Sequence, residues 1–304
     1  MRRTWTLVGL AVTLAMGCKK DGDSGAADAA VDAAADDDAD AAAFDVDTMP
    51  LFDAHAHARS TDDIALLSSK GVTAGVVLQG TDTNGLQAQM SDAKVIAFAP
   101  IPANLDQAAV MQVQMRLNAG FKGVGEMSLR LPPINATAAD DPFALMIYAA
   151  AANQVVTVHY DPEDDGTAWN TDYVDQLENA LDESLDTTFI WAHMGDAQPT
   201  LVRTLIEAHD NLYADLSARA DVWDRDKPLD LQSLTETDGA LKADWKLLFA
   251  DHPDRFLWGS DFKDERWDDL DAVLLYSRGV LAQVAPATAE KIGYQNAELM
   301  FGLR

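Results

Sequence analysis

The 304-residue chain contains one cysteine and few basic residues, and each shortage excludes something. Because Cys18 is the only cysteine, no disulfide can form within the chain. The 22 lysines and arginines face 50 aspartates and glutamates, which leaves a formal net charge of −28 at pH 7. Phosphate binding needs clustered basic residues, so this deficit argues against nucleic acid as a partner. It leaves room for a small anionic substrate held by one or two local arginines.

The first 18 residues have the layout of a secretory signal, with two arginines, an apolar stretch and small residues before Cys18. The apolar stretch, from about Trp5 to Met16, is too short to span a bilayer as a helix. Ala15-Met16-Gly17-Cys18 resembles a bacterial lipobox, in which the signal is removed and the cysteine is lipidated. An ordinary cleaved signal peptide is the alternative. We therefore expect an exported protein, lipid-anchored through Cys18 to a bacterial membrane and facing the periplasm or the cell surface.

Residues 19–47 form a second region, made almost entirely of aspartate and alanine. Repulsion between the carboxylates and the lack of a large apolar face predict a disordered, solvated tether. The formal charge is +4 for residues 1–20, −10 for residues 21–47 and −22 for residues 48–304. The folded domain that follows the tether is therefore strongly acidic in its own right.

The domain over residues 48–304 alternates short apolar runs with longer amphipathic segments, which is typical of β-α units around a parallel sheet. Eight apolar runs have the composition of strands buried on both faces: residues 50–57, 72–79, 95–101, 121–127, 155–160, 188–194, 212–217 and 255–261. They predict a single-domain α/β fold, the (β/α)8 TIM barrel, with extra C-terminal helices at about 265–283 and 286–300. The alternative, an open doubly wound sheet, lacks support because there is no Gly-x-Gly-x-x-Gly after the first run and no P-loop.

Histidines and acidic residues stand at the carboxyl ends of the predicted strands, where such barrels carry their active sites. His55 and His57 end the first run, and side-chain alternation along a strand points both to one face together with Asp53. The other residues of this rim are Glu126, His159, His193 and Asp261, which end runs four, five, six and eight. His209 and His252 precede runs seven and eight, so we expect both on the opposite rim, at helix ends or on the surface.

This arrangement resembles the amidohydrolase superfamily of metal-dependent hydrolases, most closely its amidohydrolase-2 (amidohydrolase-related) branch. The resemblance rests on Asp-x-His-x-His in the first run, the histidines ending runs five and six, and the aspartate of Trp258-Gly259-Ser260-Asp261-Phe262. Residues 296–303 are similar to the family's closing helix, so the likeness covers essentially all of residues 49–304. It implies one or two divalent metal ions per chain, with zinc expected and manganese or iron as alternatives.

The expected chemistry is hydrolysis of an amide, lactone or ester bond in a small molecule. A divalent ion bound by His55, His57 and Asp261 would lower the pKa of a coordinated water and supply hydroxide near neutral pH. Asp261 could accept the water proton and return it to the leaving group, with His193 also managing protons. A helix N-cap is the alternative role for Asp261.

Glu126 bears on the number of ions. It follows two glycines in Gly123-Val124-Gly125-Glu126 and falls where binuclear relatives place a bridging acidic or carbamylated residue. A bridging Glu126 with His159 and His193 would complete a second site. In the mononuclear branch, the strand-five histidine joins the first ion and the strand-six histidine orients or deprotonates water. The sequence leaves both a binuclear and a mononuclear site open.

Substrate contacts are expected from the loops after the strands. Arg130 and Arg219 could clamp a substrate carboxylate, because guanidinium matches its geometry bidentately, and a surface salt bridge is the alternative for each. Further candidates are Gln79, Tyr160, Trp169, Trp223 and Lys263. We expect Asp53 to accept a hydrogen bond from a ligand imidazole or from a neighbouring backbone group.

Three other functions are compatible with parts of this pattern. They are a TatD-like phosphoesterase or nuclease, a non-oxidative decarboxylase of the amidohydrolase-2 type, and a binding lipoprotein without catalysis. The acidic domain argues against the nuclease, because it would repel a polyanion over most approaches. The intact set of rim residues argues against a loss of catalysis.

Overall fold

The computed structural model describes residues 44–58, 60–72, 75–78, 86–87, 89–90, 92, 95–102, 104–129, 137–162, 170–219, 233–263 and 268–304. The predicted signal segment with Cys18, its expected lipidation site, and the predicted tether up to residue 43 lie outside the described residues, as do Gln79, Arg130, Trp169 and Trp223. Export, lipid anchoring and the roles of those four side chains therefore stay predictions.

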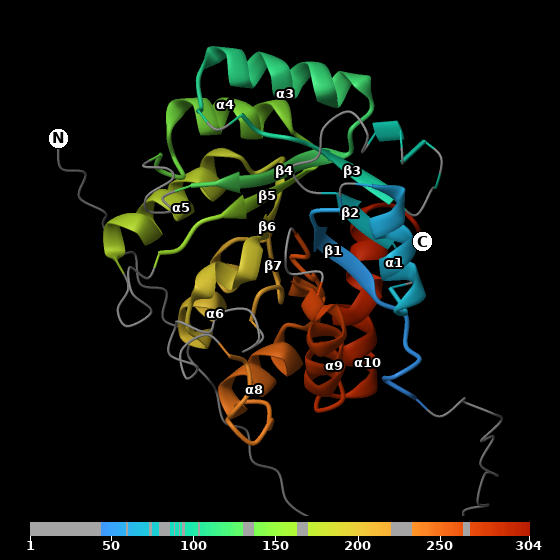
Figure 1. Cartoon of the computed structure of the whole chain (residues 1–304). Helices are drawn as coiled ribbons and strands as arrows, with labels where there is room; N and C mark the ends of the chain where they lie inside the picture. Colours follow the sequence, from blue (N-terminus) through green and yellow to red (C-terminus); the bar gives the residue numbers. More distant parts are fainter. Residues whose placement is uncertain are drawn as a thin grey trace, which may run out of the picture. The chain divides into compact units, whose positions relative to one another are not determined.

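Within the described part of the chain, eight parallel strands form one sheet in sequence order (Figure 1). They are β1 (Phe52–Ala56), β2 (Gly75–Leu78), β3 (Val95–Ala99), β4 (Gly123–Ser128), β5 (Val155–His159), β6 (Thr188–Trp191), β7 (Leu212–Asp215) and β8 (Phe256–Leu257). The sheet closes on itself, because the N–H of Ala54 donates to the carbonyl of Trp258 (3.0 Å) and that of His57 to the carbonyl of Phe262 (2.9 Å). The predicted (β/α)8 TIM barrel is confirmed.

Helices follow the strands and lie outside the sheet (Figure 1). They are α1 (Thr61–Ser69), α3 (Gln107–Ala119), α4 (Pro142–Ala150), α5 (Thr171–Glu183), α6 (Pro199–Ala208), α8 (Ala243–Asp251), α9 (Leu270–Leu281), α10 (Pro286–Glu290) and α11 (Asn296–Met300). Local sequence explains several starts: Ser60 and Asp63 form a capping box at α1, and Asp106 caps α3. The predicted C-terminal helices are present as α9 and as the succession of α10, a π-helical turn (Lys291–Gln295) and α11.

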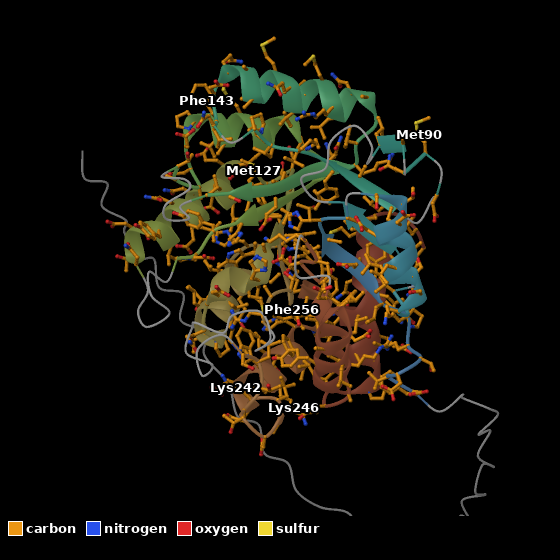
Figure 2. All side chains as sticks on the ribbon, viewed as in Figure 1. Met90, Met127, Phe143, Lys242, Lys246 and Phe256 are labelled. Atoms are coloured by element: carbon orange, nitrogen blue, oxygen red, sulfur yellow. The ribbon has the colours of Figure 1, made fainter. Side chains whose placement is uncertain are left out.

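Two apolar clusters hold the strands and helices together. The larger packs the barrel against its outer helices and includes Met127 and Phe256, which are at most 1% exposed. In the smaller, the rings of Phe52 and Phe301 stack with centroids 5.6 Å apart, which joins β1 to the C-terminal residues. In Figure 2, Met127 and Phe256 lie inside this packing, whereas Lys246 lies at its periphery. Burial of each large apolar side chain contributes about 1.5–3 kcal/mol.

None of the helices among the described residues is both long and apolar enough to cross a membrane.

Candidate metal centre

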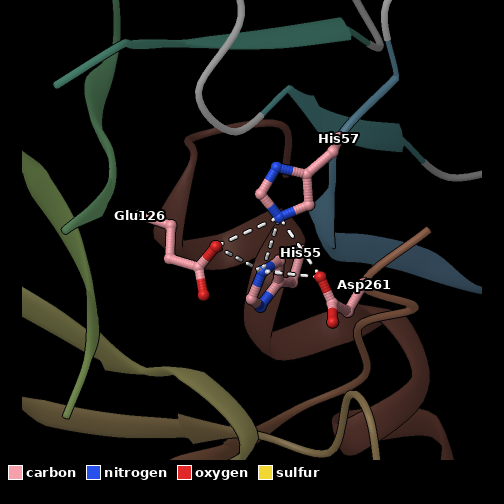
Figure 3. Close-up of side chains that lie close together, drawn as sticks. All are labelled: His55, His57, Glu126 and Asp261. Carbon is pink, nitrogen blue, oxygen red and sulfur yellow. Dashed lines mark hydrogen bonds and ion pairs between the residues drawn. The ribbon is translucent and has the colours of Figure 1, made fainter. Parts of the chain in front are cut away.

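Four of the expected ligands meet at the carboxyl end of the barrel (Figure 3). His55 lies on β1, His57 directly follows it, Glu126 lies on β4, and Asp261 follows β8. Each offers one ligand-type atom, and these atoms all lie within 4.8 Å of one another. Barrel closure causes this meeting, since the N–H of Asp261 donates to the carbonyl of His55 at 2.6 Å. Residues separated by about 200 positions in sequence thus become neighbours across the seam.

The spacing of these atoms fits a divalent ion. The Nε2 atoms of His55 and His57 are 3.2 Å apart, and His57 Nε2 lies 3.2 Å from both Glu126 Oε2 and Asp261 Oδ1. His55 Nε2 lies 3.7 Å from Glu126 Oε2 and 3.6 Å from Asp261 Oδ1. Two ligands that each sit about 2.0–2.1 Å from zinc at a tetrahedral angle are about 3.3 Å apart. Imidazole and carboxylate are also the ligand types that zinc, manganese and iron accept.

Glu126 links this group to a second one. Its Oε2 faces His55 and His57, whereas its Oε1 lies 2.6 Å from His159 Nδ1 and 3.6 Å from His193 Nε2. Glu126, His159 and His193 therefore form a further group of ligand-type residues. The single carboxylate lies between two histidine pairs and turns one oxygen to each pair.

Asp53 joins β1 to the Gly-Ser-Asp segment. Its carboxylate accepts hydrogen bonds from the N–H of Ser260 (2.9 Å), the Ser260 hydroxyl (2.5 Å) and the N–H of His55 (3.1 Å). It thus binds neighbouring backbone groups, one of the two roles expected from the sequence. Complete burial raises the pKa of the Asp53 carboxyl to about 7, although these hydrogen bonds oppose the rise.

Asp215 is a residue of this region that the sequence reasoning missed. It ends β7, is fully buried, and places Oδ2 3.0 Å from His55 Nδ1. Its Oδ1 accepts a hydrogen bond from the N–H of His193 at 3.0 Å. A signal was present, because the run Leu212-Tyr213-Ala214-Asp215 places an aspartate at the strand end where the other rim residues stand.

The charges of these groups depend on one another. Burial alone would lower the pKa of His55, but the carboxylates of Asp215 and Glu126 raise it well above its ordinary value. Burial would raise the pKa of Glu126, but His55 and hydrogen bonds from His159 and His193 hold it well below its usual range. Burial also opposes the shift of His159, whose pKa rises to about 10 through its bonds to Asp161 and Glu126. A bound cation would replace the protons held by these imidazoles, so metal binding and pH must be coupled.

His193 lies in a strained turn that follows β6. His193, Met194, Gly195 and Asp196 all have left-handed backbone angles, with φ between 51° and 59°. Each residue with a side chain costs roughly 1–2 kcal/mol in that conformation. Gly195 cannot be replaced easily, because an added Cβ would overlap the ring of Trp191. Strain of this kind persists only where the surroundings hold it, and it is common at functional sites.

The structure corrects the expectation for Arg219. The side chain is 0% exposed, and its guanidinium donates to the carbonyls of His193 and Ala197, both at 3.2 Å. Its central carbon lies 5.2 Å from the ring centroid of Trp245. Arg219 therefore binds the turn of His193 instead of reaching out to clamp a substrate. The sequence showed only that an arginine stood on this loop, and the direction of its side chain depends on tertiary packing.

Of the other side chains considered in the sequence, one lies at the proposed site and three lie in the scaffold or at the opposite end of the barrel. Lys263 is part exposed and places Nζ 3.1 Å from Asp261 Oδ1, so it lies at the metal-ligand cluster. Tyr160 is buried and donates its hydroxyl to Gln176 Oε1 at 2.5 Å, a scaffold contact. His209 and His252 directly follow α6 and α8 at the opposite end of the barrel, so their expected place at helix ends is confirmed.

Comparisons with solved structures give the same fold. The chain is similar to a dihydroorotase from Campylobacter jejuni (13% identity, TM-score 0.55, covering 84% of this chain and 84% of that one). It is similar to a TIM-barrel protein from Bordetella bronchiseptica (17% identity, TM-score 0.56, 80% and 83%). A 2,6-dihydroxybenzoate decarboxylase complexed with 2,6-dihydroxybenzoate is also similar (14% identity, TM-score 0.52, 84% and 98%). At these identities the likeness shows a shared fold.

Sequence comparisons identify the family. No curated protein matches the chain. The family model described as Amidohydrolase matches residues 35–303, which include the whole barrel and every ligand-type residue described above. The chain belongs to the amidohydrolase family and is one of its enzymes.

Proposed function

We propose that the protein is a hydrolase that uses two divalent metal ions to cleave an amide, lactone or ester bond in a small molecule. One observation carries the proposal: the Glu126 carboxylate turns Oε2 to His55 and His57, and Oε1 to His159 and His193. A carboxylate that served one ion would need a single histidine group around it. Two groups that share it support a bridging role.

The residues divide accordingly. One ion would be held by His55, His57 and Asp261. The other would be held by His159 and His193, and Glu126 would be a ligand of both ions. Divalent ions held there would activate a water as the nucleophile and polarise the bond to be cleaved. Zinc is the ion that this ligand set favours first, with manganese or iron as alternatives.

Asp261 is the group best placed to handle protons. Its carboxylate is 1% exposed, and the hydrogen bond from His57 with the charges of His55 and His193 holds its pKa well below the usual range, against the effect of burial. It is therefore an anion, the form in which a carboxylate binds a metal ion. One of its two oxygens could take a proton from the nucleophile and return it to the leaving group. If the site held a single ion and His193 bound none, its Nε2, which faces the same cluster, would be the second candidate for proton transfer.

The residues of the proposed site differ in their exposure. His55 and Asp261 are at most 1% exposed, whereas the side chains of His57 and His159 are each 17% exposed. A substrate would therefore approach past these two imidazoles. Lys263, 31% exposed beside Asp261, adds a positive charge at the same opening and suits a substrate with an anionic group. Arg130 also stays a proposed substrate contact.

The decisive experiment compares the metal-loaded protein with Asp261→Asn on lactones, carboxyl esters, N-acyl amides, phosphodiesters and aromatic carboxylates. We expect hydrolysis of a member of the first three classes, and a loss of about 10²–10⁴-fold in the variant. Turnover of phosphodiesters alone would favour the TatD-like phosphoesterase, and loss of carbon dioxide from an aromatic carboxylate would favour the decarboxylase. Inactivity on every class would favour the binding lipoprotein. One equivalent of metal at full activity would contradict the bridging role of Glu126.

Anchoring is a separate proposal. The apolar stretch and lipobox-like residues that end at Cys18 support export and lipidation, and the acidic tether would space the barrel from the membrane. A Cys18→Ser protein should stay in the aqueous fraction after detergent-free washing. If it partitions with membranes as the unaltered chain does, lipidation of Cys18 is refuted.

A further inference from the structure

We infer that Asp215, Ser217 and Arg219 form a positioning strap that orients His55 and His193 as ligands. The strap is the segment Asp215–Arg219, which continues from the end of β7. The inference rests on the proposed function, since it assigns a role toward the same ions. Asp215, Ser217 and Arg219 contact His55, His193 or the turn of His193, so each acts through a histidine.

Asp215 connects the two histidine pairs directly. One oxygen lies 3.0 Å from His55 Nδ1, and the other accepts from the backbone N–H of His193 at 3.0 Å. A carboxylate at Nδ1 selects the tautomer in which Nδ1 carries the hydrogen and Nε2 presents its lone pair. For His55, that Nε2 is the atom that faces His57, Glu126 and Asp261.

Ser217 repeats the arrangement at the second histidine. Its hydroxyl oxygen lies 2.8 Å from His193 Nδ1 and 3.2 Å from His55 Nδ1, and it also donates to Asp215 Oδ1. The Asp215 carboxylate thus fixes the direction of the hydroxyl hydrogen, which leaves the oxygen to accept from an imidazole. His193 Nε2, on the other side of the ring, then faces Glu126 with its lone pair.

Arg219 holds the strained turn itself. It donates to the carbonyl of His193, the first left-handed residue, and to that of Ala197, which follows the last one. It also lies 3.7 Å from the carboxylate of Asp196 within the turn. The guanidinium packs against the buried ring of Trp245 on α8. A fork of fixed donors anchored on an aromatic ring can span two carbonyls in a way that a lysine ammonium cannot.

The molecule offers matched controls for two of these residues. Arg255 also donates to backbone carbonyls, those of Leu212 and His209, and lies over the ring of Tyr213 at 5.3 Å, but at the opposite end of the barrel. Ser233 is also a buried serine bonded to hydroxyls, those of Thr235 and Tyr276, and it makes no hydrogen bond to a histidine among the described residues. Each control removes the same kind of contact without touching His55 or His193.

The test is cobalt binding, which needs no substrate. The unaltered protein, Asp215→Asn, Ser217→Ala, Arg219→Lys, Arg255→Lys and Ser233→Ala are titrated with Co²⁺, and the affinity and visible absorption spectrum are recorded. We expect the three strap variants to lose about 10–100-fold in affinity and to change the spectrum. The two control variants should keep the Co²⁺ affinity and the spectrum of the unaltered protein, and only their unfolding temperature should fall. Ser217→Ala, the smallest change, carries the test if another strap variant does not fold.

The outcomes separate the strap from the proposed function. Strap variants with the affinity and spectrum of the unaltered protein would refute the strap and leave the metal-dependent hydrolase standing. Equal losses in strap variants and controls would also refute it, because they would show a general effect of lost stability. An unaltered protein that binds neither Co²⁺ nor Zn²⁺ would refute the proposed function and the strap with it.

Discussion

The two ends of the barrel carry the same residue types in different surroundings. At the carboxyl end, His55, His57 and Asp261 turn ligand-type atoms toward one another, and two of the three residues are at most 1% exposed. At the amino end, His252 lies 2.9 Å from Glu207, whose side chain is 48% exposed, and 3.2 Å from Arg203. Surface pairs of this kind contribute about 0–1 kcal/mol. Histidine and carboxylate thus make a site only where several converge away from water.

The largest contrast should come from deleting one histidine at each end. His57→Ala removes a ligand, and its metal affinity should fall by more than about 100-fold, since loss of an outer hydrogen-bond partner alone costs 10–100-fold. His252→Ala should keep the metal and change the free energy of unfolding by no more than about 0.5 kcal/mol. Metal content after dialysis and denaturant unfolding measure the two effects. Equal metal loss in both variants would mean that the carboxyl end is not the metal centre.

Metal removal should destabilise the whole fold through the carboxyl end. An ion that binds the folded state alone stabilises it by about 4 kcal/mol at a concentration 1,000 times its dissociation constant. Chelation should therefore lower the unfolding temperature, and Zn²⁺ should restore it. In His57→Ala, the difference in unfolding temperature between chelated and Zn²⁺-loaded protein should be smaller than in the unaltered protein. In His252→Ala, that difference should be unchanged. An unfolding temperature that chelator does not change would contradict the proposed centre.

Glycines in left-handed conformation test the packing near His193. Gly195→Ala meets both a φ of 59° and the Trp191 ring, so we expect a loss of about 2–5 kcal/mol from strain and overpacking together. Gly239→Ala, at φ 85° with nothing within 4 Å, should cost about 1–2 kcal/mol. Urea unfolding measures both. Similar losses at the two positions would show that the turn of His193 is less constrained than its contacts imply.

The last contrast is the pH dependence of the metal-free protein. The pKa of His159 is raised from 6.5 to about 10, so its proton is held more tightly in the folded state. That stabilisation is fully present below pH 6.5 and is lost as the pH rises through about 10. Metal binding should follow the opposite trend, because the ion must displace protons. The unfolding temperatures of metal-free and Zn²⁺-loaded protein should therefore diverge as pH rises, and parallel curves would contradict the coupling.

Much of the fold could be predicted because it depends on local patterns. Apolar runs of strand length and amphipathic segments between them indicated the eight β-α units. The helix caps seen at Ser60 and Asp106 are contacts of the same short range. The carboxyl-end rule for barrels then placed His55 and Asp261 on one rim before any contact was known. Asp215 was missed because the run 212–217 was treated only as a strand, although β7 ends at Asp215, on that rim.

The sequence by itself determined the order of the β-α units, the strand ends that carry histidine and carboxylate, and the acidity of the domain. Only the tertiary structure decided where the side chains point. Closure of the barrel set Asp261 beside His55, the position of β4 turned the two oxygens of Glu126 to different histidine pairs, and the turn after β6 drew Arg219 inward. The physical reason is the range of the interactions involved. Sequence periodicity depends on neighbouring residues, whereas side-chain direction depends on contacts between residues far apart in the chain.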